Sequence, residues 1–375
     1  MWIVTLFVVT ASSQQQASDD VSEAGWKKLS LGERKMYTEQ WVADLANDDA
    51  IPLLFEDYEI VPEIGYLEIG SVIGSGPYSL VFGIKKRSDL VIKYATNCDE
   101  LENNMHPLVR DFRFGTIAAR AGVAVKPIFL SPPVFLPAMV SPKTTFPMKT
   151  AKYEYCVKRR ATLRYMIMPK VGSCVDDVPR IPYLFDNLLF ALDFGWRIVD
   201  LLEKLHTAEV VHGDVHSGNI CSMNEGQSYV LIDFGLASFA TSESSIRIRE
   251  PLALQHPNFS PWQLMGFPNG RRDDVFNALF QVAQVLNPLL PDYVANLPTD
   301  VPSDLLEFKL NANFFEYPED LIGQALCPEV AFKIKDDIQR AMNVLRAAIP
   351  QGPINYEYIT KAFKDPIMPL LNTIG

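Results

Sequence analysis

The most constraining feature of the chain is the stretch 210–239, VVHGDVHSGNICSMNEGQSYVLIDFGLASF. Two short apolar runs, VV before His212 and YVLI before Asp233, indicate buried strands with polar residues at their ends. Asn219 follows Asp214 by five residues and precedes Asp233 by fourteen. Carboxylate and amide side chains gathered at strand ends can bind magnesium and face a nucleophile. Because positioning and charge neutralisation supply most of the catalysis in phosphoryl transfer, the pattern favours that chemistry.

The stretch resembles the catalytic loop and metal-binding triplet of the protein-kinase-like superfamily, in which HGDxxxxN is followed by DFG. The resemblance implies that Asp214 orients an acceptor hydroxyl and takes its proton. It implies that Asn219 and Asp233 bind Mg²⁺ and that ATP is the phosphoryl donor. His212 is then expected to support the loop rather than to act as a general base. The implied fold is α+β and bilobal, with a small antiparallel β lobe and a larger helical lobe.

A glycine-rich hairpin, YLEIGSVIGSGPYSLVFGIKK, begins at Tyr66. Such a hairpin lets backbone amides approach phosphates without obstruction by side chains. It resembles the kinase loop G-x-G-x-x-G-x-V, with Ser79 at the third glycine and Pro77 inside the turn. The resemblance implies that nucleotide is bound by a set of residues in this hairpin: Ile73, Gly74, Ser75, Gly76 and Val81.

The next apolar run, LVIK, ends at Lys93, twelve residues after Val81. Kinases place the lysine that holds the nucleotide phosphates at this spacing, so we expect Lys93 to bind ATP and to serve catalysis. An acid on the following helix should orient this lysine. Asp111 is the best-placed candidate, whereas Glu100 and Glu102 are nearer in sequence but should precede the helix.

A proline-rich insertion is predicted at 131–150, because proline breaks both helices and central strands. The segment RYMIMPKVGSCVDDV then predicts a strand at 165–168 followed by a connector. It resembles the kinase hinge as written in the casein kinase one group. Backbone groups near Lys170 and Val171 would contact adenine, with Met168 behind it. The alternative is an ordinary strand and turn.

Two further motifs follow the DFG triplet. The SPW triplet at 260–262 stands where kinases have A-P-E, so the usual ion pair of that glutamate should be missing. RRDD at 271–274 resembles the start of a helix in the casein kinase one group. Gly213 occupies the place of an arginine that binds an activation-segment phosphate in many protein kinases. We therefore expect activity that does not require phosphorylation of that segment.

His216 stands two residues after Asp214, where protein kinases usually have lysine. HGDxHxGN resembles aminoglycoside and choline phosphotransferases, which share the fold but phosphorylate small molecules. Those enzymes lack the segment between DFG and RRDD, so its presence favours a Ser/Thr protein kinase with protein substrates. A small-molecule kinase and a non-catalytic kinase-like binding module stay open as alternatives.

The N-terminal apolar run 2–11 is followed by small and polar residues, which is typical of a signal peptide. It predicts a signal at 1–13 and passage through the secretory pathway or secretion, with no membrane span after cleavage. A cytoplasmic protein with a hydrophobic N-terminal segment is the alternative. Residues 26–47 have roughly helical spacing of apolar residues, which predicts an amphipathic helix.

The predicted domains follow from these motifs. An N-terminal extension at 14–60 should precede a small lobe at 61–171. A large lobe at 172–375 should end in a C-terminal helical extension to which the motifs assign no chemistry. With 48% hydrophobic residues, the chain can build a sizeable core.

Charge and cysteine content limit the partners. The formal net charge of −11 argues against nucleic acid or an anionic membrane surface as the main partner. The 5 cysteines show no CxxC pair and no zinc-ligand spacing, and the odd count excludes a fully paired disulfide scaffold. Buried free thiols are the favoured interpretation, although one or two bridges would be compatible. The sequence makes no prediction of the oligomeric state.

Overall fold

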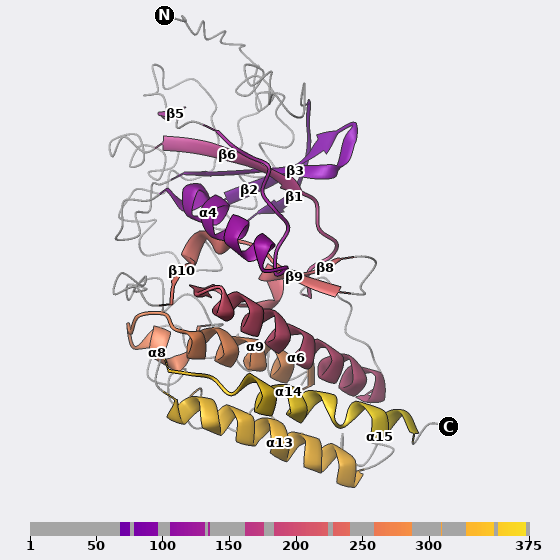
Figure 1. Cartoon of the computed structure of the whole chain (residues 1–375). Helices are drawn as coiled ribbons and strands as arrows, with labels where there is room; N and C mark the ends of the chain where they lie inside the picture. Colours follow the sequence, from indigo (N-terminus) through magenta and orange to yellow (C-terminus); the bar gives the residue numbers. More distant parts are fainter. Residues whose placement is uncertain are drawn as a thin grey trace, which may run out of the picture. The chain divides into compact units, whose positions relative to one another are not determined.

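A computed structural model describes eleven parts of the chain. These are residues 68–75, 79–96, 106–131, 134–135, 162–175, 184–223, 228–240, 259–286, 309, 328–348 and 352–372. Helices and an antiparallel sheet make up the structure, which confirms the α+β class (Figure 1). The chain divides into two compact units, one of Met1–Asp99 with Ser131–Tyr165 and one of Glu100–Leu130 with Met166–Gly375. The predicted domain boundaries stay a prediction.

The main sheet has six strands in the order β1-β2-β3-β6-β4, with β5 also paired to β6. The strands are β1 (Glu68–Ser75), β2 (Ser79–Lys85), β3 (Arg87–Thr96), β4 (Phe129–Leu130), β5 (Val134–Phe135) and β6 (Thr162–Pro169). The β1–β2 and β2–β3 pairs are antiparallel, as a glycine-rich hairpin requires. Strand β6 contains the predicted strand at 165–168, where Tyr165, Met166 and Ile167 are buried.

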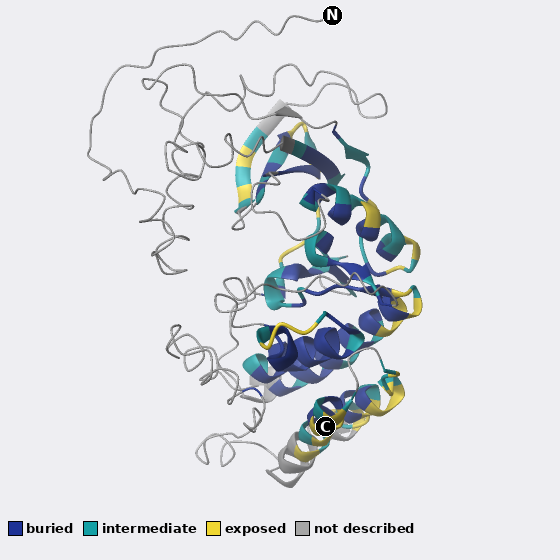
Figure 2. Cartoon of the chain, turned by 90° about the vertical axis from the view of Figure 1, so that its left-hand side faces the viewer, coloured by how far each residue is buried: buried dark blue, intermediate teal, exposed yellow. Residues whose placement is uncertain are grey.

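The second unit is mainly helical. Its helices are α4 (Pro107–Arg120), α6 (Leu184–Thr207), α8 (Pro261–Leu264), α9 (Arg271–Leu286), α13 (Pro328–Ala347), α14 (Tyr356–Lys364) and α15 (Ile367–Asn372). The predicted helix at 184–208 is α6, and the RRDD motif opens α9 as expected. Helix α9 is buried almost throughout, from Arg272 to Ala283, whereas the other helices also carry half-buried or exposed positions (Figure 2). Helices α6 and α14 approach closely, because a Cβ added at Gly195 would lie 2.5 Å from the Phe363 ring.

The stretch 210–239 folds as two small strand pairs joined by short turns. Its elements are β7 (Val210–Val211), the 3-10 turn η2 (Ser217–Asn219), β8 (Ile220–Met223), β9 (Ser228–Leu231), the 3-10 turn η4 (Phe234–Leu236) and β10 (Ser238–Phe239). Strand β8 pairs with β9, and β7 pairs with β10, both antiparallel. The VV and YVLI runs are therefore strands, as predicted.

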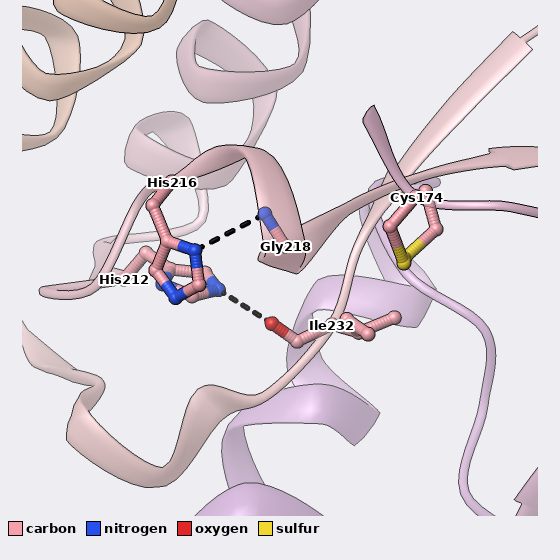
Figure 3. Close-up of a disulfide and its surroundings, with 6 residues drawn as sticks. Cys174, His212, His216, Gly218 and Ile232 are labelled. Atoms are coloured by element: carbon pink, nitrogen blue, oxygen red, sulfur yellow. Dashed lines mark hydrogen bonds between the residues drawn. A yellow bond between two sulfur atoms is a disulfide. The ribbon is translucent and has the colours of Figure 1, made fainter. Parts of the chain in front are cut away.

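Cys174 and Cys221 form a disulfide across a sequence separation of 47 residues (Figure 3). The interpretation of these two cysteines as free thiols is therefore wrong. The backbone places them together, since Gly172 N–H donates to the Ser222 carbonyl (2.9 Å) and Ser222 N–H donates to the Ser173 carbonyl (2.9 Å). No local sequence spacing predicts this disulfide, because the pairing depends on how two segments far apart in the sequence meet. The other three cysteines lie outside the described residues.

Several predictions concern residues that the structure does not describe. They are the signal at 1–13, the helix at 26–47 and most of the insertion at 131–150, as well as Gly76, Glu100 and Glu102. Among the helices that are described, none combines the length and apolar character needed to cross a membrane.

Candidate functional site

In the first unit, strand register aligns three of the residues predicted to bind nucleotide. Gly74 of β1 lies opposite Val81 of β2, and Val81 lies opposite Lys93 of β3. Directly opposed residues of antiparallel strands project to the same face of a sheet. The glycine leaves room on that face, because a Cβ added at Gly74 would meet only Val81, at 3.7 Å and beyond. Lys93 is buried, whereas Ile73, the residue directly before Gly74, is exposed.

In the second unit, Asp214 and Asn219 are in direct contact. The Asn219 Nδ2 donates to the Asp214 carbonyl (3.0 Å) and to Asp214 Oδ2 (3.3 Å). The 3-10 turn η2 brings Asn219 back to the aspartate, since its N–H donates to the His216 carbonyl (2.8 Å). Because Nδ2 donates to Asp214, the amide oxygen is the atom of this side chain that can accept a metal ion.

Asp233 lies at the same end of the β8–β9 hairpin as Asn219. Ile220 pairs with Leu231, and Ile232 N–H donates to the Asn219 carbonyl (3.0 Å), so the two predicted metal ligands flank the first rungs of one ladder. Asp233 has the left-handed backbone conformation (φ 61°), and its Oδ1 accepts the Gly235 N–H at 3.3 Å. Positive φ is uncommon outside glycine and concentrates at functional sites. A carboxylate and an amide oxygen are suitable ligands for Mg²⁺.

Helix α4 holds the turn that follows Asp233. Phe234 N–H donates to Asp111 Oδ1 (2.9 Å), and Arg110 Nη1 donates to the Ala237 carbonyl (3.0 Å). Asp111 is buried, and burial lowers the pKa of the Arg110 guanidinium. Asp111 therefore has a defined role within its own unit, as an acceptor for the DFG backbone. Its role as the partner of Lys93 stays a prediction.

His212 is a structural support, as expected. Its Nδ1 accepts the Asp214 N–H (3.3 Å), and its Nε2 bonds the Ile232 carbonyl (3.0 Å), so the neutral ring carries its proton on Nε2 (Figure 3). Its backbone N–H donates to Asp274 Oδ2 (2.7 Å), and Gly213 N–H donates to Asp274 Oδ1 (2.8 Å). One buried carboxylate from α9 thus holds two consecutive amides of the loop that leads to Asp214.

A second histidine, His206, connects Asp274 to helix α14 in the C-terminal region. His206 Nε2 lies 2.9 Å from Asp274 Oδ2, and His206 Nδ1 hydrogen-bonds the hydroxyl of Tyr356 on α14. Burial raises the pKa of the Tyr356 hydroxyl, so the hydroxyl keeps its proton at neutral pH. The sequence motifs assigned no chemistry to this region. No local signal could have found the contact, because the two residues lie 150 positions apart.

His216 faces Asp214. Its Nδ1 accepts the Gly218 N–H (3.1 Å), and its Nε2 lies 3.8 Å from Asp214 Oδ2 (Figure 3). Because Nδ1 is an acceptor, a neutral ring carries its proton on the nitrogen that faces Asp214. The residue that stands in place of the kinase lysine thus presents an N–H donor to the site.

The residues predicted to contact adenine lie at the end of β6 and directly after it. Met168 and Val171 are half-buried, and Lys170 is exposed. The following backbone, Gly172 and Ser173, hydrogen-bonds to Ser222 on β8. This segment therefore lies beside the strand that begins next to Asn219. Adenine binding by these residues stays a prediction.

At the SPW triplet, Trp262 contacts Arg272 of α9 through its ring. The Arg272 guanidinium lies 3.5 Å from the centre of the Trp262 ring, and Arg272 Nη1 donates to the Ala348 carbonyl (2.6 Å). A cation over an aromatic face is attractive, and more so when it is desolvated. Burial lowers the pKa of Arg272, as removal from water does for any cation.

The predicted residues thus form two sets, each described in its own unit. The first unit holds Ile73, Gly74, Ser75, Val81 and Lys93, and the second holds Met168, Lys170, Val171, Asp214, Asn219 and Asp233. Sequence reasoning missed Gln263, which contacts the loop directly. The sequence does contain the capping box S-x-x-Q at the start of α8. This pattern predicts a helix N-terminus but does not predict the contact with the loop.

Two known proteins are similar to part of the chain. The "Serine/threonine-protein kinase VRK1" of Caenorhabditis elegans is 34% identical over 82 residues, which are 21% of this chain and 13% of that protein. The "Probable serine/threonine-protein kinase FPV212" of Fowlpox virus (strain NVSL) is 26% identical over 82 residues, which are 22% of this chain and 27% of that protein. The similarity therefore spans well under two thirds of these relatives. No family model matches the chain. The partial similarity supports a place in the protein-kinase-like superfamily.

Proposed function

We propose that the chain is a bilobal, protein-kinase-like enzyme that transfers the γ-phosphoryl group of ATP to Ser or Thr of protein substrates. The observation that carries the proposal is the convergence of Asp214, Asn219 and Asp233 at one end of the β8–β9 hairpin. Two partial relatives whose names describe Ser/Thr protein kinases support the same reading.

The chemistry assigns a separate task to each residue. Asp214 accepts the proton of the acceptor hydroxyl while the hydroxyl oxygen bonds to the γ-phosphorus. The bond between the γ-phosphorus and the β,γ-bridging oxygen breaks, and ADP leaves with that oxygen. Asn219 keeps the Asp214 carboxylate oriented through Nδ2. Asn219 Oδ1 and the Asp233 carboxylate would hold Mg²⁺, which neutralises phosphate charge when bound. Lys93 would hold the phosphates from the face that it shares with Gly74 and Val81.

The test is transfer from labelled ATP with magnesium to casein, to other protein acceptors and to a panel of small alcohols. Wild type should label protein, and Asp214→Asn should lose about 10²–10⁴-fold in kcat, the usual contribution of a general base. Asp233→Asn should weaken the magnesium dependence. A wild-type protein that binds ATP but labels no acceptor, with binding unchanged in both variants, would show a non-catalytic binding module instead.

One observation favours a second candidate, a small-molecule kinase. His216 faces Asp214 where protein kinases usually carry lysine, and the motif HGDxHxGN resembles aminoglycoside and choline phosphotransferases. Label that appears only in the small alcohols of the same assay would select this alternative.

We also propose an oxidising compartment, such as the secretory pathway, for the protein. The Cys174–Cys221 disulfide supports it, because structural disulfides are rare in reducing compartments. Mass spectrometry of the native protein would show the disulfide-linked peptides and the mature N-terminus. Free thiols at both positions would argue for the cytoplasmic alternative.

A further inference from the structure

The side chain of Gln263 makes four hydrogen bonds in a fully buried site. Its Nε2 donates to the Gly213 carbonyl (2.9 Å) and to Asn269 Oδ1 (3.0 Å). Its Oε1 accepts the Ser260 N–H (2.8 Å) and Asn277 Nδ2 (2.9 Å). Since a carbonyl oxygen can only accept and an N–H can only donate, the orientation of the amide is fixed. A capping box explains only the bond to Ser260, so the two bonds of Nε2 go beyond a helix cap.

The bond to Gly213 acts on the peptide that leads into the catalytic aspartate. The peptide group is planar, so its oxygen and its N–H move together. Gln263 holds the oxygen of the Gly213–Asp214 peptide, and His212 Nδ1 holds its N–H (3.3 Å). Fixing both sides of this plane fixes the direction in which Asp214 leaves the backbone. Asn219 Nδ2 then fixes the Asp214 carboxylate itself.

The neighbourhood of Gly213 is closed to any side chain. Gly213 has φ +80°, and an added Cβ would lie 2.5 Å from Asn269 Nδ2 and 2.7 Å from the Leu236 carbonyl. The Asn269 amide, which Gln263 also holds, thus takes the space into which a side chain at 213 would project. The catalytic loop is therefore tied to the residues around α8 by uncharged, buried amides.

We propose that Gln263 is a positioning residue for Asp214. Gln263 links Ser260, directly before α8, to the catalytic loop, and this link needs no phosphorylated residue. The proposal rests on the proposed phosphoryl transfer for its effect on rate. It gives a physical basis for activity that is independent of phosphorylation, because the bonds between Ser260, Gln263 and Gly213 are present in the unmodified chain.

Gln263→Glu distinguishes a positioning role from a purely structural role. The shape is kept, but an ionised carboxylate places an acceptor against the Gly213 carbonyl, which cannot become a donor. Protonation of the carboxyl returns one donor. We expect kcat at pH 8 to fall about tenfold or more relative to wild type, with KM for ATP changed less than about twofold. The deficit should shrink by about threefold or more at pH 6. Because Asp273, whose pKa burial raises to about 6, is linked to residue 263 through Ser260, the ratio is also measured in the Asp273→Asn background, where that carboxyl does not titrate.

Ile338→Ala is the matched control for lost stability. Ile338 is buried on α13 in the same core, and such truncations cost about 2–5 kcal/mol. Its kcat per folded molecule should stay within about twofold of wild type at every pH. If Gln263→Glu behaves like this control, with no pH-dependent ratio, the positioning role is overturned. Loss of activity after treatment of wild type with a phosphatase would also overturn it.

Amide hydrogen exchange separates this inference from the proposed function. In Gln263→Ala, exchange in the peptide 212–219 should become about tenfold faster, while exchange in the hairpin 220–231 stays unchanged. This result supports the coupling even if wild type transfers no phosphate. Unchanged exchange in 212–219 would overturn the coupling even if wild type is an active kinase.

Discussion

The β8–β9 hairpin and the loop 212–217 lie next to each other in sequence but are held in different ways. The hairpin is held by its own backbone ladder, with four residue pairs from Ile220↔Leu231 to Met223↔Ser228. The loop before η2 has no ladder. Three of its amides and one of its carbonyls are held by side chains from 50 to 64 positions away, namely Asp274, Gln263 and Gln281, whereas the Asp214 N–H is held by the nearby His212.

The residues proposed to bind metal, Asn219 and Asp233, flank the hairpin, whereas the proposed proton acceptor, Asp214, lies in the loop. Backbone ladders survive most single substitutions, because each residue contributes only part of the pairing. A loop that is held by a few buried side chains depends on each of them, since a lost partner leaves a buried N–H or carbonyl without a hydrogen bond. We therefore expect Asp214 to be far more sensitive to distant mutations than Asn219 or Asp233.

The largest expected effect comes from Asp274→Ala. The change removes the acceptor of two buried backbone amides, His212 N–H and Gly213 N–H, and the partner of His206. Each orphaned buried donor costs about 1–3 kcal/mol, so the free energy of unfolding should fall by about 3–5 kcal/mol. Urea denaturation followed by fluorescence measures this change. A loss below about 1 kcal/mol would contradict the description of the loop as held from a distance.

Removal of the disulfide tests whether the β8–β9 hairpin is held by its own ladder. Cys221 is part of the hairpin, and its bridge to Cys174 closes a separation of 47 residues. Loop closure of that size is worth about 2–4 kcal/mol, which the double variant Cys174→Ala/Cys221→Ala should lose. Because the β8–β9 ladder remains, magnesium-dependent nucleotide binding by the folded protein should change little. Thermal unfolding and ATP titration measure the two effects, and equal loss in both would show that the hairpin is not self-sufficient.

The support of the loop should depend on pH through Asp273. Burial raises the pKa of Asp273 from 3.8 to about 6, although Ser260 Oγ and Gly270 N–H donate to its carboxyl group. The folded protein then binds this proton more tightly than the unfolded chain. The resulting stability is fully present below pH 3.8 and is lost as pH rises through about 6. It amounts to about 2–3 kcal/mol.

Asp273→Asn provides the measurement, because an amide does not titrate. The difference in unfolding free energy between wild type and this variant should fall by about 2–3 kcal/mol between pH 4 and pH 7. Denaturation curves at four or five pH values in that range give the difference. A constant difference would show that Asp273 has an ordinary pKa. Exchange in the hairpin 220–231 should be the same in both proteins at each pH.

The smallest expected effect belongs to Tyr356→Phe. The variant removes the hydroxyl that hydrogen-bonds His206 and keeps the half-buried ring. One partly buried hydrogen bond contributes about 1 kcal/mol, and the effect on kcat should stay below about threefold, because Asp274 still holds the loop. Comparison with Tyr358→Phe, at an exposed tyrosine on the same helix, isolates the hydroxyl contact. A larger fall in kcat would make α14 a second support for Asp214.

Local patterns predicted the elements and most of the candidate residues. The apolar runs predicted β7 and β9, the helical spacing predicted α6, and RRDD predicted the start of α9. Each of these signals lies within one element, where side-chain periodicity and strand or helix geometry coincide. Motif spacing selected Lys93, which lies within β3, and Asp214, Asn219 and Asp233, which lie in or next to the short turns that follow β7 and β9.

The sequence alone selected the side chains proposed to carry the chemistry and predicted several of the strands and helices. Only the tertiary structure decided what holds those side chains: the Cys174–Cys221 bridge, the Gln263 bond to Gly213 and the contact of His206 with Tyr356. These partners lie 47 to 150 positions apart, and hydrogen bonds over such separations have no period along the chain. They exist because packed helices and strands bring polar groups together where water cannot satisfy them.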